Sequence, residues 1–231
     1  MCQVRFRHFA IATIAFTAVT CSLGCGKSGP RQAAATATVQ SSPAAEAAPA
    51  IAARREDSPQ PVDPVVVLHT TQGDITLKLY AEKAPRTVEN FVRGYAERGF
   101  YDQTIFHHVE PGQMLIGGGF TTDFQRKPGR APIYNESRNG LSNRRGTVAM
   151  VRDPDAPHSA TSEFFINLAH NADFDHRASG EEDVPGYCVF GEVIGGLEVI
   201  DRIAQLPTAV NGDFPKLPSP AVSIVTVQRV Q

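Results

Sequence analysis

The residues best suited to chemistry are two adjacent histidines, His107 and His108, in the segment TIFHHVEPGQMLIGGGF at 104–120. Histidine binds transition metals and exchanges protons near neutral pH, so the pair suggests either a metal site or an acid–base site. The apolar run around the pair predicts a β-strand, in which neighbouring side chains point to opposite faces. This spacing argues against one metal ion held by both histidines, and the other histidines show no short-range ligand pattern.

Short strands separated by turn signals must hold these two histidines in place. The runs at 65–71 and 74–80 are rich in β-branched and apolar residues, and the Gln-Gly pair between them predicts a hairpin. Similar strand candidates alternate with turns rich in Gly, Pro and Asn as far as the closing run at 221–230. Many short strands with only two helices predict a mainly β fold, a closed barrel whose ends the helices cover.

Two amphipathic segments supply the predicted helices. The first, within residues 84–100, has Pro85 in its first turn, Gly99 at its end and apolar residues at i, i+3, i+4 and i+7. The second, within residues 196–206, has its apolar stripe at Leu197, Ile200, Ile203 and Ala204.

The N-terminal region predicts export and anchoring. Residues 1–24 have two arginines before an apolar stretch of signal-peptide length. The residues before Cys25 resemble a bacterial lipobox, although Ser22 stands where leucine is typical, so we expect cleavage before Cys25 and a lipid on its sulfur. An ordinary secretory signal is the alternative. Residues 25–61, rich in Ala, Pro and Ser, predict a flexible tether of roughly 35 Å, and residues 62–231 form the folded domain. The chain is then an exported, membrane-anchored lipoprotein that faces the periplasm or the cell exterior.

Charge and cysteine content argue against a nucleic-acid partner and against an intrachain disulfide. The net charge is −2 and no run of Lys or Arg occurs, so we expect no nucleic-acid partner. Loss of the signal peptide removes two of 22 basic residues and leaves 20 against 24 acidic ones, a net charge of −4. With Cys25 lipidated, Cys188 alone remains in the domain, where we expect a small core residue and no intrachain disulfide.

Six motifs carry a resemblance to a known family. They occur in the order and at about the spacing found in cyclophilins, the peptidyl-prolyl cis-trans isomerases, and the resemblance covers residues 64–231. It implies a closed eight-stranded antiparallel β-barrel capped by two α-helices. We expect a monomer that takes proline-containing polypeptides as clients and needs no cofactor or metal. The motifs are GDITLKLYAEKAPRTVENFV, GFYDQTIFHHV, GGGF, NRRGTVAM, SATSEFFINL and YCVFGEVIGGLEVID.

The implied reaction makes and breaks no bond. An X–Pro amide prefers trans only weakly, but its rotation faces a barrier of about 18–20 kcal/mol from amide resonance. A catalyst must bind the twisted amide better than either planar form. That requires an apolar pocket for the proline ring and a hydrogen-bond donor near the prolyl nitrogen, a role that an arginine fills in the family.

The groove implied by the resemblance differs from that of the family at five positions, and each change adds, removes or replaces a polar group. His108 stands at the position of the catalytic arginine, Gln113 replaces a phenylalanine, and Ile116 and Glu163 replace two glutamines. Asp175 replaces a leucine. The resemblance places His108 in the catalytic position and implies these substrate-binding residues: His107, Gln113, Met114, Ile116, Arg152, Glu163, Phe165, Phe174, Asp175 and Tyr187.

Three functions are open at this stage. In the first, the chain is an isomerase of reduced or altered activity, and Glu163 raises the pKa of His108 so that a cationic imidazole replaces the arginine. In the second, the groove binds proline-containing peptides, as a binding module or chaperone, without turnover. In the third, His108, Glu163 and Asp175 form the metal site of a hydrolase, but the sequence offers no recognisable nucleophile or metal motif for it.

Overall fold

The computed structural model describes residues 62–179 and 182–231. The predicted signal peptide, the tether and Cys25 lie outside the described residues. Within that part of the chain, no helix is both long enough and apolar enough to span a membrane.

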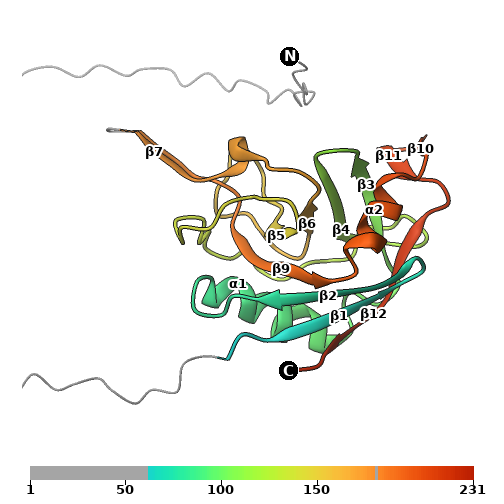
Figure 1. Ribbon diagram of the computed structural model, residues 1–231, viewed down its shortest axis with the longest axis horizontal. Helices are drawn as coiled ribbons and strands as arrows, with labels where there is room; N and C mark the ends of the chain where they lie inside the picture. The colour runs from blue at the N-terminus through green and yellow to red at the C-terminus, as the bar shows by residue number, and fades with distance from the viewer. Residues whose placement is uncertain (1–61, 180–181) are drawn as a thin grey trace, which may run out of the picture. The chain divides into compact units, whose positions relative to one another are not determined.

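Eight antiparallel strands close into the barrel that the sequence predicts (Figure 1). Inward-facing apolar residues alternate with outward-facing residues along the strands, so β1 shows buried and half-buried positions in strict turn. The order around the barrel is β1 (Val65–Thr70), β12 (Val222–Arg229), β3 (Thr104–Glu110), β4 (Met114–Thr121), β6 (Phe164–Asn167), β5 (Thr147–Met150), β9 (Val189–Gly195) and β2 (Gly73–Leu79).

The hairpin β1–β2 shows how turn chemistry sets the register. Val65 pairs with Lys78 at one end and Thr70 with Gly73 at the other. Gly73 has a φ of +124°, a conformation that residues with a Cβ atom rarely adopt. The predicted hairpin is therefore confirmed, with its glycine at the position that requires one.

The first helical segment changes its hydrogen-bonding pattern twice. It begins as an α-helix, α1 (Pro85–Glu89), continues as a π-helix, η1 (Asn90–Tyr95), and ends in a 3₁₀ turn, η2 (Ala96–Arg98). Gly99 then stops it with a φ of +64°. The predicted helix and both of its boundary signals are confirmed, but the π-helical middle was not predicted.

The second helix, α2 (Leu197–Ala204), faces the barrel with a different stripe from the predicted one. Val199, Ile200 and Ile203 are buried, whereas Leu197 is 42% exposed. Leu197 is the first residue of the helix, directly after Gly196 with a φ of +84°, and lies at the edge of the packed face there. The prediction of a helix is correct, and the assignment of Leu197 to its buried face is wrong.

Aromatic rings fill the barrel core. Phe91 of η1 lies with its ring centroid 5.0 Å from that of Tyr101 and 5.2 Å from that of Phe190. Phe164 of β6 meets Phe91 and Tyr101 edge to face. Cys188 is buried and free, which confirms the predicted small core residue, and burial raises the pKa of its thiol to about 12.

Two small hairpins and a short turn lie outside the barrel. β10 (Thr208–Asn211) and β11 (Phe214–Pro218) form a hairpin that packs against β3. β7 (Arg177–Ser179) and β8 (Glu182–Val184) form another, and Figure 1 shows β7 projecting away from the barrel. The 3₁₀ turn η3 (Ala172–Phe174) follows β6.

Candidate active site

A β-bulge turns both histidines toward the outer face of the barrel. Phe106 pairs with Gly117 and His108 with Ile116, so two steps along β3 match one step along β4 and His107 is the extra residue. Phe106 and Val109, on either side of the pair, lie in the barrel core. The ring of His107 instead packs 4.7 Å from Phe120, in a separate apolar cluster with β11. The expectation that the two histidines point to opposite faces is therefore wrong, because it assumed a regular strand.

The strand register places His108 in a row with apolar residues on that outer face. His108 pairs with Ile116, Ile116 pairs with Phe165, and Phe165 pairs with Ala149. Residues directly opposite one another in antiparallel strands lie on the same face of the sheet. The imidazole therefore lies one strand away from Ile116 and two strands away from the ring of Phe165.

An aromatic pocket surrounds Phe165. The ring centroids of Phe165, Phe174 and Tyr187 lie 5.2–5.7 Å apart in tilted and edge-to-face contacts. The pocket has the apolar character and the aromatic walls that a proline ring requires. Its other side chains are Met114, Ile116, Leu141, Ala149, Val151 and Val189.

Arg152 holds one wall of this pocket. Its guanidinium carbon lies 4.6 Å from the centroid of the Tyr187 ring. Its nitrogens donate to four backbone carbonyls, those of Asp153, Pro154, Pro185 and Gly186. The arginine thus fixes Tyr187 from behind by a cation–π contact and leaves no nitrogen without a partner.

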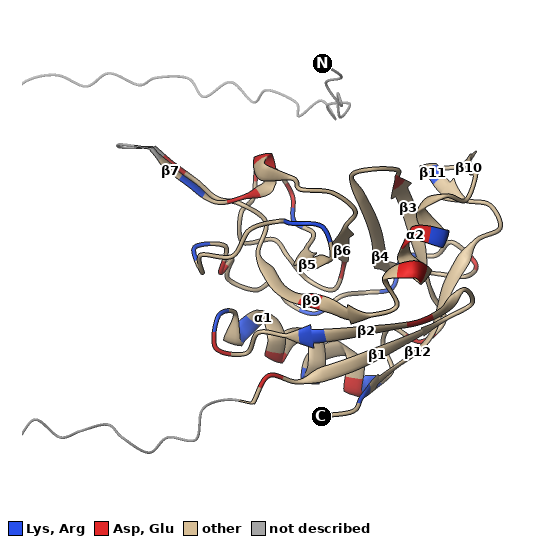
Figure 2. Ribbon diagram, viewed as in Figure 1, with Lys and Arg blue, Asp and Glu red and all other residues tan. Residues whose placement is uncertain are grey.

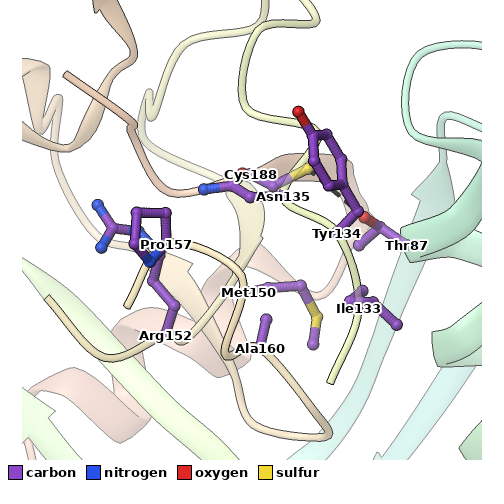
Figure 3. Close-up of a pocket in the computed structure, with 9 residues that line it drawn as sticks. All are labelled: Thr87, Ile133, Tyr134, Asn135, Met150, Arg152, Pro157, Ala160 and Cys188. Atoms are coloured by element: carbon purple, nitrogen blue, oxygen red, sulfur yellow. Dashed lines mark hydrogen bonds between the residues drawn. The ribbon is translucent and has the colours of Figure 1, made fainter. Parts of the chain in front are cut away.

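Arg152 also lines a small hollow of about 10 Å³ next to the pocket. Figure 3 shows its lining side chains, which come from the start of the first helical segment and from the loops around β5 and β9. They are largely apolar and include Met150, Ala160 and the buried thiol of Cys188. The hollow carries no charged group other than Arg152, so it supplies packing space and no chemistry of its own.

Asp175 and Gln113 hold loops together. The Oδ1 atom of Asp175 accepts hydrogen bonds from the backbone N–H of Asn143 at 2.6 Å and from its Nδ2 at 3.0 Å. The carbonyl of Gln113 accepts from Leu168 N and from Asn171 Nδ2, both at 2.9 Å. Asp175, expected on the polar rim, uses its carboxylate inside the protein.

Glu163 does not pair with His108. Its Oε1 atom lies 2.6 Å from Nη2 of Arg126, and its Oε2 atom lies 3.5 Å from Nε2 of His107. Burial raises the pKa of Glu163, and the nearby Arg126 opposes that rise. The hypothesis that Glu163 makes His108 cationic is therefore wrong, because the carboxylate is turned toward the bulged histidine and an arginine from another loop.

Both histidines are neutral at neutral pH. Burial, His108 and Arg126 lower the pKa of His107 to about 4. Burial also lowers the pKa of His108; Lys216 adds to this, and Glu110, whose Oε2 lies 4.0 Å from Nε2 of His108, opposes it. The groove therefore presents an uncharged imidazole where the resemblance implies a permanent cation.

The structure does not assemble the alternative metal site. Asp175 binds Asn143 and Glu163 binds Arg126, so neither carboxylate joins His108. Across residues 62–179 and 182–231, no group of three or more His, Cys, Asp or Glu side chains is arranged to hold a metal ion. Nothing in this geometry supports the hydrolase hypothesis.

Sequence reasoning missed the charged residues around the histidines. Arg126 lies in a polar loop after β4, and Lys216 of β11 forms an ion pair with Glu110. Neither position belongs to a motif, and both come close to the histidines only through tertiary packing. Figure 2 shows acidic and basic residues interspersed over the domain, so colour alone does not single these two out.

Comparisons with known proteins agree with this geometry. The family model described as cyclophilin type peptidyl-prolyl cis-trans isomerase/CLD matches residues 65–229. Peptidyl-prolyl cis-trans isomerase B of Escherichia coli is 45% identical over 163 residues, 71% of this chain and 98% of that protein. Peptidyl-prolyl cis-trans isomerase A of Dickeya dadantii is 46% identical over 166 residues, 72% of this chain and 84% of that protein.

A solved structure shows the same fold. A cyclophilin type peptidyl-prolyl cis-trans isomerase of Cryptosporidium parvum, crystallised in the presence of the dipeptide Ala-Pro, superposes with a TM-score of 0.58 at 22% identity. The match covers 72% of this chain and 99% of that one.

Proposed function

The chain belongs to the cyclophilin-type peptidyl-prolyl cis-trans isomerases, and we propose that it turns over slowly because the neutral imidazole of His108 replaces the family's arginine. The observation that supports this proposal is the row from His108 through Ile116 to Phe165, which sets a single N–H donor beside an aromatic pocket. The family fixes the reaction, and the row determines how well this chain performs it.

The apolar half of the site binds the proline ring. The ring packs among Phe165, Phe174 and Met114, which removes it from water and fixes one end of the X–Pro amide. The amide then lies along the groove over Ile116. An isoleucine there cannot hydrogen-bond to the planar amide, so it favours no ground-state geometry by such a bond.

His108 acts on the twisted amide. As resonance is lost during rotation, the prolyl nitrogen gains a lone pair that an N–H group can bind. A neutral imidazole has one N–H donor, whereas arginine has five and a permanent charge. Because charged donors form hydrogen bonds roughly twice as strong as neutral ones, we expect stabilisation of the twisted state that is weaker but not abolished.

The test is an isomerisation assay with a proline-containing tetrapeptide on the full chain and on His108→Ala. We expect a rate above buffer for the natural chain and a several-fold loss for the alanine variant. A second measurement, peptide binding by fluorescence or NMR titration, identifies the other candidate function. A chain that binds the peptide but isomerises it no faster than buffer is a binding module, a function favoured by the uncharged donor.

We also propose that the chain is an exported monomer anchored by a lipid on Cys25 and that its clients are exported proteins. The apolar N-terminal stretch, the lipobox-like residues before Cys25 and the Ala- and Pro-rich segment at 25–61 support this location. Metabolic labelling with a fatty acid should mark the natural chain and not Cys25→Ser, which should leave the membrane fraction. Equal labelling of both chains contradicts the anchor.

A further inference from the structure

Arg126 lies across the outer face of the barrel, at the edge of the groove. The backbone of Arg126 bridges to that of Phe120, and its guanidinium carbon lies 5.4 Å from the centroid of the Phe120 ring. Its Nη2 atom lies 2.6 Å from Oε1 of Glu163. The arginine side chain is 66% exposed while that of Glu163 is 14% exposed, so a half-buried carboxylate anchors a guanidinium that still faces solvent.

Glu163 places this guanidinium close to the proline pocket. Phe164 is buried in the barrel core, so Glu163 and Phe165 on either side of it both point outward, with Cα atoms about 7 Å apart. The side chain of Glu163 lies over Gly119 of β4. A Cβ atom added at Gly119 would lie 2.5 Å from Cγ of the glutamate. An extended peptide advances about 3.3 Å per residue, so a substrate chain that leaves the pocket at Phe165 passes the Glu163 position within about two residues, and Arg126 is bound to the Glu163 carboxylate.

Arg126 keeps more of its donors available than the two other cations described near the groove, Arg152 and Lys216. Arg152 gives its nitrogens to four backbone carbonyls, and Lys216 pairs with Glu110. Within residues 62–179 and 182–231, the one hydrogen-bond partner found for Arg126 is Glu163. A guanidinium has five N–H groups, so most of them can reach a ligand.

From this arrangement we propose that Arg126, positioned by Glu163, donates a charged hydrogen bond to a backbone carbonyl of the substrate chain that flanks the X–Pro unit. This inference rests on the isomerase function proposed above. It makes Arg126 a substrate-binding residue and Glu163 a positioning residue. In the family the cation is an arginine at the position of His108 on β3, whereas in this chain the cation is Arg126, in the loop after β4.

A purely structural ion pair is the competing explanation. In that case the Arg126–Glu163 contact only holds the loop that follows β4, and its loss changes stability and leaves catalysis alone. The two explanations differ in their dependence on substrate length. A donor to the flanking chain matters only for a peptide long enough to have that chain, whereas a loosened loop affects short and long peptides alike.

The experiment compares Arg126→Gln and Arg126→Lys with Arg229→Gln in the full chain. Arg229 pairs with Glu97 and is 43% exposed, so its variant controls for the loss of one surface ion pair on another part of the barrel. We measure kcat/KM on a proline-containing hexapeptide by coupled assay, cis–trans exchange of an Ala-Pro dipeptide by NMR, and Tm for each variant.

We expect Arg126→Gln to lower kcat/KM on the hexapeptide by about tenfold through loss of a charged donor, with dipeptide exchange unchanged. Arg126→Lys should recover part of the loss, and Arg229→Gln should equal the natural chain. Glu163→Gln, which releases the guanidinium, should raise KM more than it lowers kcat.

Hexapeptide activity of Arg126→Gln within twofold of the natural chain overturns the inference and leaves the isomerase function standing. An equal loss on both substrates also overturns it, because that result is the signature of a loosened loop. If the natural chain does not accelerate either substrate, the proposed isomerase function fails and the role of Arg126 fails with it.

Discussion

The two halves of the groove differ in how they are built. The apolar half, around Phe165, Phe174 and Tyr187, rests on strand register and on ring packing. The polar half contains His107, His108 and the ion pair between Glu163, just before β6, and Arg126, in the loop after β4. A proline pocket tolerates few changes because it must fit a ring, whereas a hydrogen-bond donor can be replaced or supplied from another element. The comparison leads us to propose that the proline pocket still binds its ring while the stabilisation of the twisted amide depends on different groups.

Removal of the central ring of the proline pocket should have the largest effect on both stability and activity. Phe165→Ala leaves a cavity at a side chain that is 2% exposed, so it should cost roughly 3–5 kcal/mol of unfolding free energy. It should also lower kcat/KM by about 100-fold as the proline loses its main contact. Urea unfolding and the isomerisation assay measure the two effects.

Phe100→Ala is the matched control for the pocket ring. Phe100 packs against Tyr95 and Tyr101 in the main core cluster and does not belong to the cluster that forms the proline pocket. The control should lose stability and keep its activity at a temperature where it is folded. If both variants lose activity equally, the apolar pocket is not the proline site.

The buried histidine of the polar half should make stability depend on pH. The pKa of His107 is about 4 in the folded chain and near 6.5 when unfolded, so the unfolded chain binds the proton more readily. Stability is therefore full above the unfolded pKa and falls as pH drops from about 6.5 toward 4, by at most roughly 3 kcal/mol. Urea unfolding at pH 7 and pH 4.5 measures this loss.

His107→Gln should lose less stability than the natural chain between those two pH values, because the titrating group is gone. His170→Gln, at an exposed position, should behave like the natural chain. An unchanged pH dependence in His107→Gln would show that other groups account for the acid lability.

Restoring a permanent cation in the polar half should make isomerisation faster. His108→Arg adds charged N–H donors at the position opposite Ile116, and we expect kcat/KM to rise by about tenfold. The isomerisation assay on the tetrapeptide gives the comparison directly. Since the proline pocket is untouched, KM for the peptide should change little. A variant that is slower than the natural chain contradicts the role given to His108.

The smallest expected effect comes from the cation that supports one wall of the apolar half. Arg152→Gln removes the cation beneath Tyr187 and leaves the other pocket rings in place. A cation–π contact of about 0.5–1 kcal/mol predicts a two- to fivefold loss in kcat/KM. Steady-state kinetics should show the loss mainly in KM. A loss far greater than this, in a variant whose Tm is unchanged, would mean that Arg152 contacts the substrate itself.

The fold and the apolar half could be predicted because local pattern and register determine them. The alternation of β1 and β2, the Gly73 turn and the run at 164–167 each place side chains on a face without knowledge of distant loops. The polar half could not be predicted in this way. A bulge at His107 reverses the expected direction of one side chain, and only packing brings Arg126 to Glu163.

The central claim, that the donor His108 is neutral and acts on the twisted amide, is tested most directly by the pH dependence of kcat/KM. His107, Glu110 and Lys216 face His108, and His108→Arg retains all three, so the variant serves as the reference that carries the same neighbouring groups. Because the pKa of His108 is lowered below 6.5, the ratio of the natural chain's rate to that of His108→Arg should stay flat from pH 9 to pH 7. It should rise as pH falls further and the imidazole becomes cationic. A ratio that stays constant down to the acid limit of folding, or that falls on acidification, contradicts the account.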